Sequence, residues 1–296
     1  MINKNLASDC HETAPRLTHR DVGAQVLQAS LANTAGIFYL SPLSVGLPGA
    51  GSAPAPARGG VPVLFPQFAD GPISGPPALA GLPALLRRPA LPKHGLVRSA
   101  HWHLLEDTAA PGRHRLGYGL DIATDDYPAW PHAVRLRLQA QAQTDTLVFS
   151  LQVSNTGREA FSWTGGLHPY FAVPDVLRSS LFGLAGLALQ DRYDTALRTQ
   201  PSGDLGWNEQ PFERLFDACP PVILDAGAYS LRLSATGFDQ WMVWNPGEAG
   251  ATALADLPAG DWRRFVCVEP VCVARPIKLE PGETFEGTLC IQVCRH

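Results

Sequence analysis

The sequence has no apolar run of about 20 residues, the length that a membrane-spanning helix needs. Its first 21 residues are polar and lack the apolar stretch of a secretory signal. We therefore expect a soluble, cytoplasmic protein with no membrane contact. Runs of basic residues are also missing, because the 23 Lys and Arg residues are spread along a chain whose net charge is −4. Without a row of cations to neutralise successive phosphates, we do not expect nucleic-acid binding.

Several common catalytic signatures are absent as well. The chain contains no GxxxxGK[ST] loop, no GxSxG elbow, no HExxH pair and no GxGxxG that opens a helix. Their absence weighs against the common nucleotide-binding, serine hydrolase and zinc protease classes. The six cysteines form no CxxC pair, and two of them lie in apolar, strand-like runs. Buried, reduced thiols are therefore expected in place of disulfides or a zinc site.

What the chain does have is alternation of apolar and polar residues with period two. In 133–143 the apolar residues fall on one face and the arginines and glutamines on the other, which predicts a half-buried strand. With 146–155 and 161–173 it predicts an antiparallel meander of three strands. Further strand-like runs occupy 24–31, 36–42, 101–106, 114–123, 230–237, 240–246, 263–273 and 285–294. Together with 28 Gly and 27 Pro, this pattern predicts an all-β fold, a large antiparallel β-sandwich with few short helices.

The length of 296 residues is compatible with one β-sandwich domain. No internal repeat is apparent, and we expect a single domain over residues 1–296 that acts as a monomer. Two segments rich in Gly and Pro, 46–62 and 70–95, interrupt the strand pattern. Long loops on a rigid scaffold often carry function, so the cations at their ends are of interest.

One possible metal site is the segment HWHLLE, 101–106. On a strand, His101 and His103 share a face, as two imidazole ligands of one ion would. No matching downstream histidine in a Gly/Pro turn accompanies them. We expect two exposed strand histidines and no metal.

Cationic residues stand at the ends of both loops. Arg58 opens RGGVPVLFPQF, and KHGLVR supplies Lys93, His94 and Arg98. Such side chains could converge on an anionic group, since the planar fork of arginine suits phosphate or carboxylate. The alternative is that they are solvated loop residues.

Two titratable residues lie in segments of strand character. In RRFVCVEPVCV (263–273), alternation puts Glu269 on the same face as Phe265 and Cys267. Burial there would raise its pKa towards a value useful for a general base. The alternative is a carboxylate at a strand edge in a salt bridge. His168 in TGGLHPYFAV is either a hydrogen-bonded structural residue or a second catalytic group. Together they would suffice for acid–base catalysis without a metal or cofactor.

Nine segments in order carry a resemblance to a known family. They are FYLSP (38–42), RGGVPVLFPQF (58–68), KHGLVRSAHW (93–102), WPHAVRLRL (130–138), NTG (155–157), LHPYF (167–171), VWNP (243–246), CVEP (267–270) and LEPGETFEGTL (279–289). Together they resemble the aldose 1-epimerase superfamily, in its hexose-6-phosphate mutarotase (glucose-6-phosphate 1-epimerase) branch. The resemblance implies a galactose-mutarotase-like β-supersandwich that interconverts the α and β anomers of an aldohexose 6-phosphate without a cofactor.

The resemblance also implies roles for the two titratable residues. His168 of LHPYF matches the general acid, which protonates the ring oxygen as the sugar ring opens. Glu269 of CVEP matches the general base, which removes the proton of the anomeric hydroxyl. Pro169 departs from the family, which usually has threonine at that position.

Five further residues match substrate-binding positions of the family. Arg58 and Arg98 match the arginines that hold the phosphate, Lys93 precedes the family's histidine, and His94 is that histidine. Glu213, in ERLF, stands where the family usually has a substrate-binding aspartate. Two alternatives stay open: a free-aldose 1-epimerase, and a catalytically silent sugar-phosphate-binding module.

Overall fold

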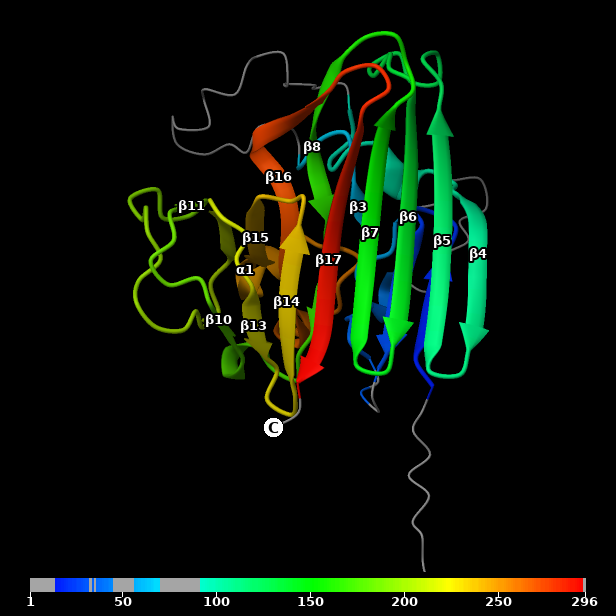
Figure 1. The fold of residues 1–296 in the computed structure, drawn as a ribbon. Coiled ribbons are helices and arrows are strands. Elements are labelled where there is room, and N and C mark those ends of the chain that lie inside the picture. The colour runs from blue at the N-terminus through cyan, green and yellow to red at the C-terminus, as the bar shows by residue number, and fades with distance from the viewer. Residues whose placement is uncertain (1–13, 32–33, 35, 45–55, 70–90, 295–296) are drawn as a thin grey trace, which may run out of the picture.

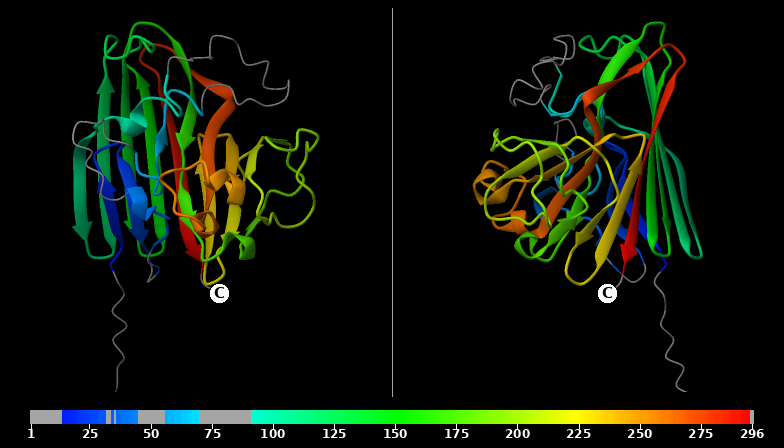
Figure 2. Two further views of the ribbon diagram at one scale, coloured as in Figure 1. Left: turned by 180° about the vertical axis from the view of Figure 1, so that it is seen from behind. Right: turned by 60° about the vertical axis from the view of Figure 1, so that its left-hand side comes forward.

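The computed structural model describes residues 14–31, 34, 36–44, 56–69 and 91–294. Over these residues the chain forms two large antiparallel sheets that lie face to face, as expected for an all-β sandwich (Figure 1). Figure 2 shows the two layers from behind and obliquely. A separate two-stranded sheet pairs β1 (Arg16–Arg20) with β2 (Gln25–Ser30).

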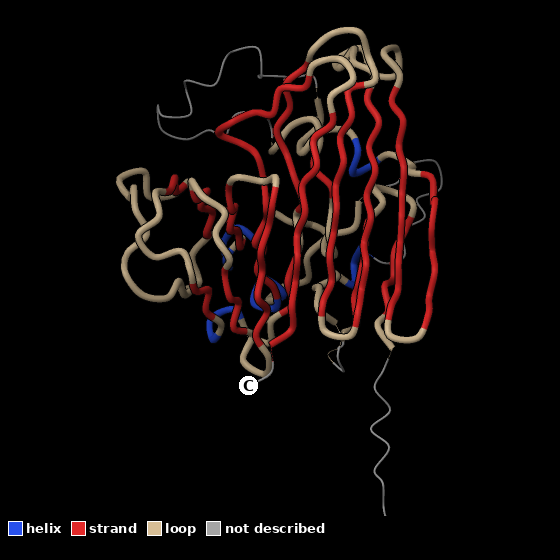
Figure 3. Tube along the Cα trace, viewed as in Figure 1, coloured by secondary structure: helices blue, strands red, loops and turns tan. Residues whose placement is uncertain are grey.

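Helical structure is scarce in the described residues (Figure 3). It consists of the short helix α1 (Gly247–Ala251) and the 3-10 turns η1 (Pro42–Ser44), η3 (Val97–Ser99), η4 (Val176–Arg178) and η5 (Asp261–Arg264). None of these helices has the length and apolar character that crossing a bilayer requires.

The first large sheet has eight strands among the described residues. Their spatial order is β10 (Ser180–Phe182), β13 (Val222–Asp225), β14 (Ser230–Thr236), β17 (Thr284–Cys294), β7 (Thr146–Asn155), β6 (Val134–Gln143), β5 (Arg113–Ile122) and β4 (His103–Ala110). In β6 and β7 buried residues alternate with partly or fully exposed ones, because one face packs on the core and the other faces water.

The second sheet has seven strands in the described part of the chain. The path runs β11 (Leu189–Asp191), β12 (Phe212–Phe216), β15 (Gln240–Asn245), β16 (Phe265–Leu279), β8 (Phe161–Leu167) and β3 (Val63–Leu64), and β9 (Tyr170–Ala172) also pairs with β16. The first nine residues of β16 are all buried. One face of this strand packs on the other sheet, and its second face is covered as well, which accounts for the nearly continuous apolar run in the sequence.

The predicted meander of 133–143, 146–155 and 161–173 is wrong in its third strand. β6 and β7 do form a hairpin, but the other edge of β7 pairs with β17. The chain then crosses to the second sheet, where β8 pairs with β16 and β3. Period-two alternation gives a strand and its faces, and it is the same in either layer of a sandwich.

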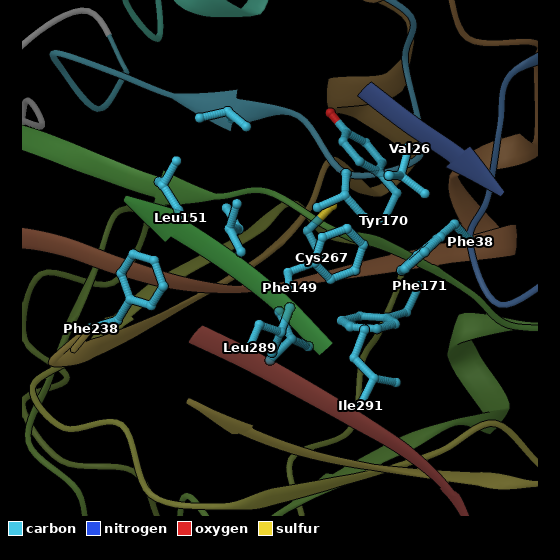
Figure 4. Close-up of a cluster of buried hydrophobic side chains, with 14 of the residues drawn as sticks. Val26, Phe38, Phe149, Leu151, Tyr170, Phe171, Phe238, Cys267, Leu289 and Ile291 are labelled. Carbon is cyan, nitrogen blue, oxygen red and sulfur yellow. The ribbon is translucent and has the colours of Figure 1, made fainter. Parts of the chain in front are cut away.

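The hydrophobic core fills the space between the two sheets. Figure 4 shows part of it, where Phe38 and Phe171 meet Phe149, Leu289 and Ile291 of the eight-stranded sheet. Phe38 lies in the predicted strand 36–42, which forms only isolated bridges, one of them to Phe171. Most apolar residues of this segment are nevertheless buried, as its pattern predicts.

Candidate active site

Strand register places two rows of side chains across one face of the second sheet, the face opposite to that of Val266 and Phe171. Directly opposed residues in antiparallel strands point to the same face. The first row crosses β12, β15, β16 and β9 through Glu213, Trp244, Cys267 and Tyr170. The second row lies two residues further along β12, β15 and β16 and consists of Leu215, Met242 and Glu269. This face carries the chemistry that the sequence analysis singled out.

His168 completes the second row. β8 pairs Gly166 with Val271 of β16, and β9 pairs Tyr170 with Cys267. The register is the same on both sides of the break between β8 and β9, so it puts His168 directly opposite Glu269. The imidazole Nε2 lies 3.4 Å from the carboxylate Oε1. Two segments a hundred residues apart in sequence thus supply one pair of interacting groups.

Pro169 accounts for the break in this strand. The backbone N–H groups of His168 and Tyr170 point towards the β3 side, where they donate to Pro62 and Gly60. The nitrogen at position 169 therefore faces β16, and proline has no hydrogen to donate there. The departure from the family pattern interrupts the ladder and leaves the His168 position in register.

A cavity of about 500 Å³ opens on this face. All seven predicted site residues line it: Arg58, Lys93, His94, Arg98, His168, Glu213 and Glu269. The remaining lining residues are Phe68, Ala69, Tyr170, Arg192, Tyr193, Met242, Trp244, Pro246, Gly250, Ala253 and Leu254. The cavity combines apolar walls with a few charged groups, as small-molecule sites commonly do.

Burial controls the protonation of the catalytic candidates. Glu269 is 1% exposed and His168 is 7% exposed. Burial, and then the Glu213 carboxylate, raises the pKa of Glu269 well above its usual value. Burial, and then the Arg98 and Arg58 charges, lowers the pKa of His168 well below its usual value. Burial thus favours the uncharged form of each group, a protonated carboxyl on Glu269 beside a neutral imidazole on His168.

Each member of this pair has a buried atom that no other group in the described part of the chain satisfies. These atoms are Nδ1 of His168 and Oε2 of Glu269. Buried polar atoms are normally paired, and exceptions concentrate at functional sites. The ring of His168 is held in place by Tyr170, on which it stacks with a centroid distance of 4.8 Å, and by the edge of Trp244.

The two glycines before His168 allow neighbouring strands to pack closely and do not line the cavity. A Cβ atom on Gly165 would lie 2.0 Å from the carbonyl oxygen of Leu64, and one on Gly166 would lie 2.2 Å from that of Pro270. Both glycines have positive φ and neither lines the cavity. They let β3 and β16 approach β8 closely, which sets the position of His168.

Arg58 already has protein partners. Its Nε donates to Oδ1 of Asp256 at 2.6 Å, and one terminal nitrogen lies 3.4 Å from the Tyr170 hydroxyl. Arg98, in η3, has an unused hydrogen-bond donor, because its buried Nε has no partner among the described residues. Burial is the main cause that lowers the pKa of Arg98. Lys93 is exposed at the same wall. The two loops thus do bring their cations together.

His94 is fixed as a neutral hydrogen-bond donor. Its Nδ1 accepts the backbone N–H of Ala69 at 3.2 Å, so the ring proton sits on Nε2. Burial, and then the neighbouring His168 and Arg98, lowers the pKa of His94 well below its usual value. The residue has a φ of 64° and also donates its backbone N–H to the Ala69 carbonyl. The Nε2–H group is therefore the one available to a ligand.

Glu213 forms an ion pair that the sequence did not predict. Nη1 of Arg192 lies 2.9 Å from one carboxylate oxygen of Glu213 and 3.2 Å from the other. The sequence analysis missed Arg192, Asp256 and Trp244 as site residues. Trp244 stands within the VWNP segment of the resemblance, which was a usable signal. Arg192 and Asp256 stand in no such segment, and only the folded chain brings them to the cavity or its arginine.

The predicted loops lie partly outside the described residues. Residues 45–55 and 70–90 are not described, whereas the cation-bearing ends at 56–62 and 91–95 are. His101 and His103 are exposed, as expected, and neither belongs to a possible metal group. Five cysteines are free, with Cys267 and Cys272 buried, and Cys10 lies outside the described residues.

One group among the described residues could offer three ligands to a metal ion. It consists of His168, Cys267 and Glu269, whose donor atoms lie within 4.8 Å of one another. Burial raises the pKa of the Cys267 thiol and of Glu269, so both keep the protons that a metal must displace. The cations Arg58 and Arg98 add repulsion. These residues suit proton transfer better than metal binding.

Comparison with known proteins gives a consistent result. A family model described as aldose 1-epimerase matches residues 16–292. A protein of Cenchrus ciliaris named "Putative glucose-6-phosphate 1-epimerase" is 26% identical over 280 residues, which cover 91% of this chain and 78% of the relative.

Solved structures share the fold. The Salmonella typhimurium protein YeaD superimposes with a TM-score of 0.78 at 21% identity, over 96% of this chain and 88% of that one. A galactose mutarotase related enzyme from Lactobacillus acidophilus gives a TM-score of 0.65 at 14% identity, over 95% and 94% of the two chains. The predicted galactose-mutarotase-like sandwich is thereby confirmed.

Proposed function

The chain belongs to the aldose 1-epimerase family, an isomerase family that interconverts sugar anomers, and we propose that its substrate is an aldohexose 6-phosphate. One observation carries the proposal: a buried acid–base pair lines the same cavity as the cationic side chains of Arg58, Lys93 and Arg98. We also propose that residues 1–296 form one domain that works as a cytoplasmic monomer. In support, all seven predicted site residues meet within a single chain.

Anomer exchange needs one proton removed and one proton supplied. Opening the ring takes the proton from the hydroxyl on C1 and adds a proton to the ring oxygen, O5. Rotation about the C1–C2 bond then presents either face of the aldehyde, and closure reverses both transfers. We propose that Glu269 removes the O1 proton and His168 supplies the O5 proton. Both side chains line the cavity, and O1 and O5 are bonded to the same carbon, so closely spaced groups can reach them.

The proton count of the pair supports this assignment. Before ring opening the mechanism needs a Glu269 carboxylate and a protonated His168. After it, the pair consists of a carboxylic acid and a neutral imidazole, which is the state that burial favours. Both states contain the same single proton, so no exchange with solvent is needed during a turnover.

A phosphate on the substrate would help to reach the reactive state. After burial, the charges that most lower the pKa of His168 belong to Arg98 and Arg58, with Lys93 a smaller cause. A dianionic phosphate bound by these cations would offset their field and favour a protonated His168. The sugar would then lie with C6 on the His168 side, because C5 and C6 continue from the ring oxygen.

Exchange spectroscopy by NMR tests the proposal. We expect the wild-type protein to speed α–β exchange of glucose 6-phosphate or galactose 6-phosphate more than that of free glucose. His168→Ala and Glu269→Gln should each lower the catalysed rate by at least about 100-fold. If both variants exchange as fast as the wild type, the mechanism is wrong. Tight sugar-phosphate binding without any catalysed exchange would indicate a silent binding module, and equal rates on free hexoses would indicate a free-aldose epimerase.

A further inference from the structure

An ion pair at the cavity wall joins a residue without an assigned role to a predicted substrate ligand. Nη1 of Arg192 contacts both carboxylate oxygens of Glu213, at 2.9 and 3.2 Å. The backbone N–H of Arg192 also donates to the Glu213 carbonyl at 3.0 Å, at the end of the β11–β12 pairing. Both residues line the cavity. The pair is thus anchored by main chain and side chain together.

The Glu213 carboxylate shares a sheet face with Glu269. Glu213 stands opposite Trp244 in one row, and Glu269 stands opposite Met242 in the next. β12 and β16 are separated only by β15, so about 10 Å separates the two strands. At that range, in a partly buried site, two carboxylates repel each other appreciably. Glu213 is accordingly the second cause, after burial, that raises the pKa of Glu269.

We propose that Arg192 is a positioning residue, whose ion pair aims the Glu213 carboxylate at the bound sugar and balances its negative charge beside the His168–Glu269 pair. The inference rests on the proposed function, because it assigns Arg192 a part in that same reaction. Arg192 acts through Glu213 and need not touch the reacting atoms.

The variants leave the other ionisable groups around the pair in place. They are the cations Arg58, Lys93 and Arg98, the neutral His94, the strand residues Cys267 and Tyr170, and Tyr193. Burial is the main cause that raises the pKa of Tyr193, with Glu213 raising it further and Arg192 lowering it, so its phenol stays neutral across the profile. A shift in the pH profile after substitution at Arg192 or Glu213 therefore reports the charge removed at those positions.

If Arg192 had a purely structural role, its loss would change the stability of the protein and leave the pH profile of exchange in place. The Arg192 side chain is 47% exposed and that of Glu213 is 12% exposed. Because solvent reaches the Arg192 side chain and screens its charge, we expect the pair to contribute little to folding stability. The pair of Arg263 with Asp175 is a matched control, at 45% and 22% exposure, and neither residue lines the cavity. Loss of either arginine should change the melting temperature by a similar, small amount.

The experiment compares Arg192→Gln, Glu213→Gln, the double variant, Arg192→Lys and Arg263→Gln. For each, the rate of anomer exchange of a hexose 6-phosphate is measured by NMR as a function of pH and substrate concentration. In Arg192→Gln an unbalanced carboxylate remains, so both limbs of the profile should move to higher pH. Glu213→Gln removes the carboxylate that raises the pKa of Glu269, so both limbs should move to lower pH. The double variant should return close to the wild-type profile.

The affinity should change in parallel. Loss of an oriented carboxylate that accepts sugar hydroxyls should raise KM about tenfold in both single variants, with a smaller change in kcat. Arg192→Lys should keep the wild-type pH profile, because it keeps the charge. Arg263→Gln should match the wild type in both measurements.

Two negative results have different meanings. Wild-type exchange on hexose 6-phosphates, together with an Arg192→Gln variant that keeps the wild-type profile and KM, would overturn this inference alone. Absence of catalysed exchange by the wild-type protein on every hexose 6-phosphate would overturn the proposed function, and this inference with it. Opposite shifts in the two single variants, cancelled in the double variant, would establish it.

Discussion

His168 and Glu269 face each other across neighbouring strands, with Nε2 of the imidazole 3.4 Å from Oε1 of the carboxylate. Their separation is set by the spacing of β-strands and by an unbroken register around Pro169. A pair held in this way offers one proton acceptor and one proton donor at fixed positions, which is what the proposed ring opening requires.

The buried carboxyl group of Glu269 should carry a cost in stability. Because its pKa is raised in the native protein, the native state keeps a proton that the unfolded chain releases above about pH 4.3. The free energy of unfolding contributed by this group therefore falls as the pH rises from there towards the native pKa. We expect Glu269→Gln, besides lowering the catalysed rate, to raise the free energy of unfolding at about pH 7.5 by about 1 kcal/mol.

The gain in the free energy of unfolding is measured by urea denaturation between about pH 3.5 and 8. This range starts below the usual glutamate pKa and ends well above it. The advantage of Glu269→Gln should disappear at the acid end, where both states of the wild type are protonated. Glu280→Gln, at an exposed position, is the control and should show no such trend. A variant that is less stable than the wild type throughout would mean that the carboxyl group is stabilised by contacts that glutamine cannot replace.

Arg98 should be the cation whose loss most selectively weakens binding of a phosphorylated sugar. Arg58 is held by Asp256, whereas the buried Nε of Arg98 lacks a partner among the described residues. A charge-assisted hydrogen bond contributes about 1.5–3 kcal/mol, so Arg98→Ala should raise KM for a hexose 6-phosphate roughly 10- to 150-fold. KM for the free hexose should change little. Equal effects on both sugars would sink the phosphate assignment.

How far the sequence could predict the fold is clear from β16. Alternation in 263–273 placed Glu269 correctly on the face of Phe265 and Cys267, because side-chain direction is a local property of a strand. The same reasoning could not tell that 161–173 leaves the sheet of β6 and β7, since the choice of partner strand depends on the whole sandwich. Short strands such as β11 and β12 were missed, because three to five residues give too little pattern.

The site shows the same division. The residues that the resemblance assigned all reach one cavity, since each lies in a segment that the fold positions as a unit. Arg192 and Asp256 were not predicted because each matters only through the residue that it pairs with. In the sequence they are ordinary charged loop residues, and the fold brings them to Glu213 and Arg58. The need for glycine at 165 and 166 likewise depends on the fold, since neighbouring backbones occupy the space that a Cβ atom would fill.

We expect His94 to have two separable roles, one in its loop and one in the cavity. Its Nδ1 accepts the Ala69 N–H while its backbone holds a φ of 64°, and its Nε2–H stays available to a ligand. Asparagine tolerates this backbone conformation and can offer an acceptor to Ala69, but it is too short to replace the Nε2 donor. We expect His94→Asn to raise KM about tenfold with near wild-type stability.

His94→Ala should raise KM to a similar extent and also lower the free energy of unfolding, by about 1–3 kcal/mol, because alanine lacks the acceptor and is strained at positive φ. Urea denaturation and the substrate dependence of anomer exchange separate the two effects. Because burial keeps the imidazole neutral, the contribution of His94 to KM should be constant between about pH 6 and 8, around the usual pKa of histidine. Equal stability of the two variants would show that the bond to Ala69 does not hold the loop.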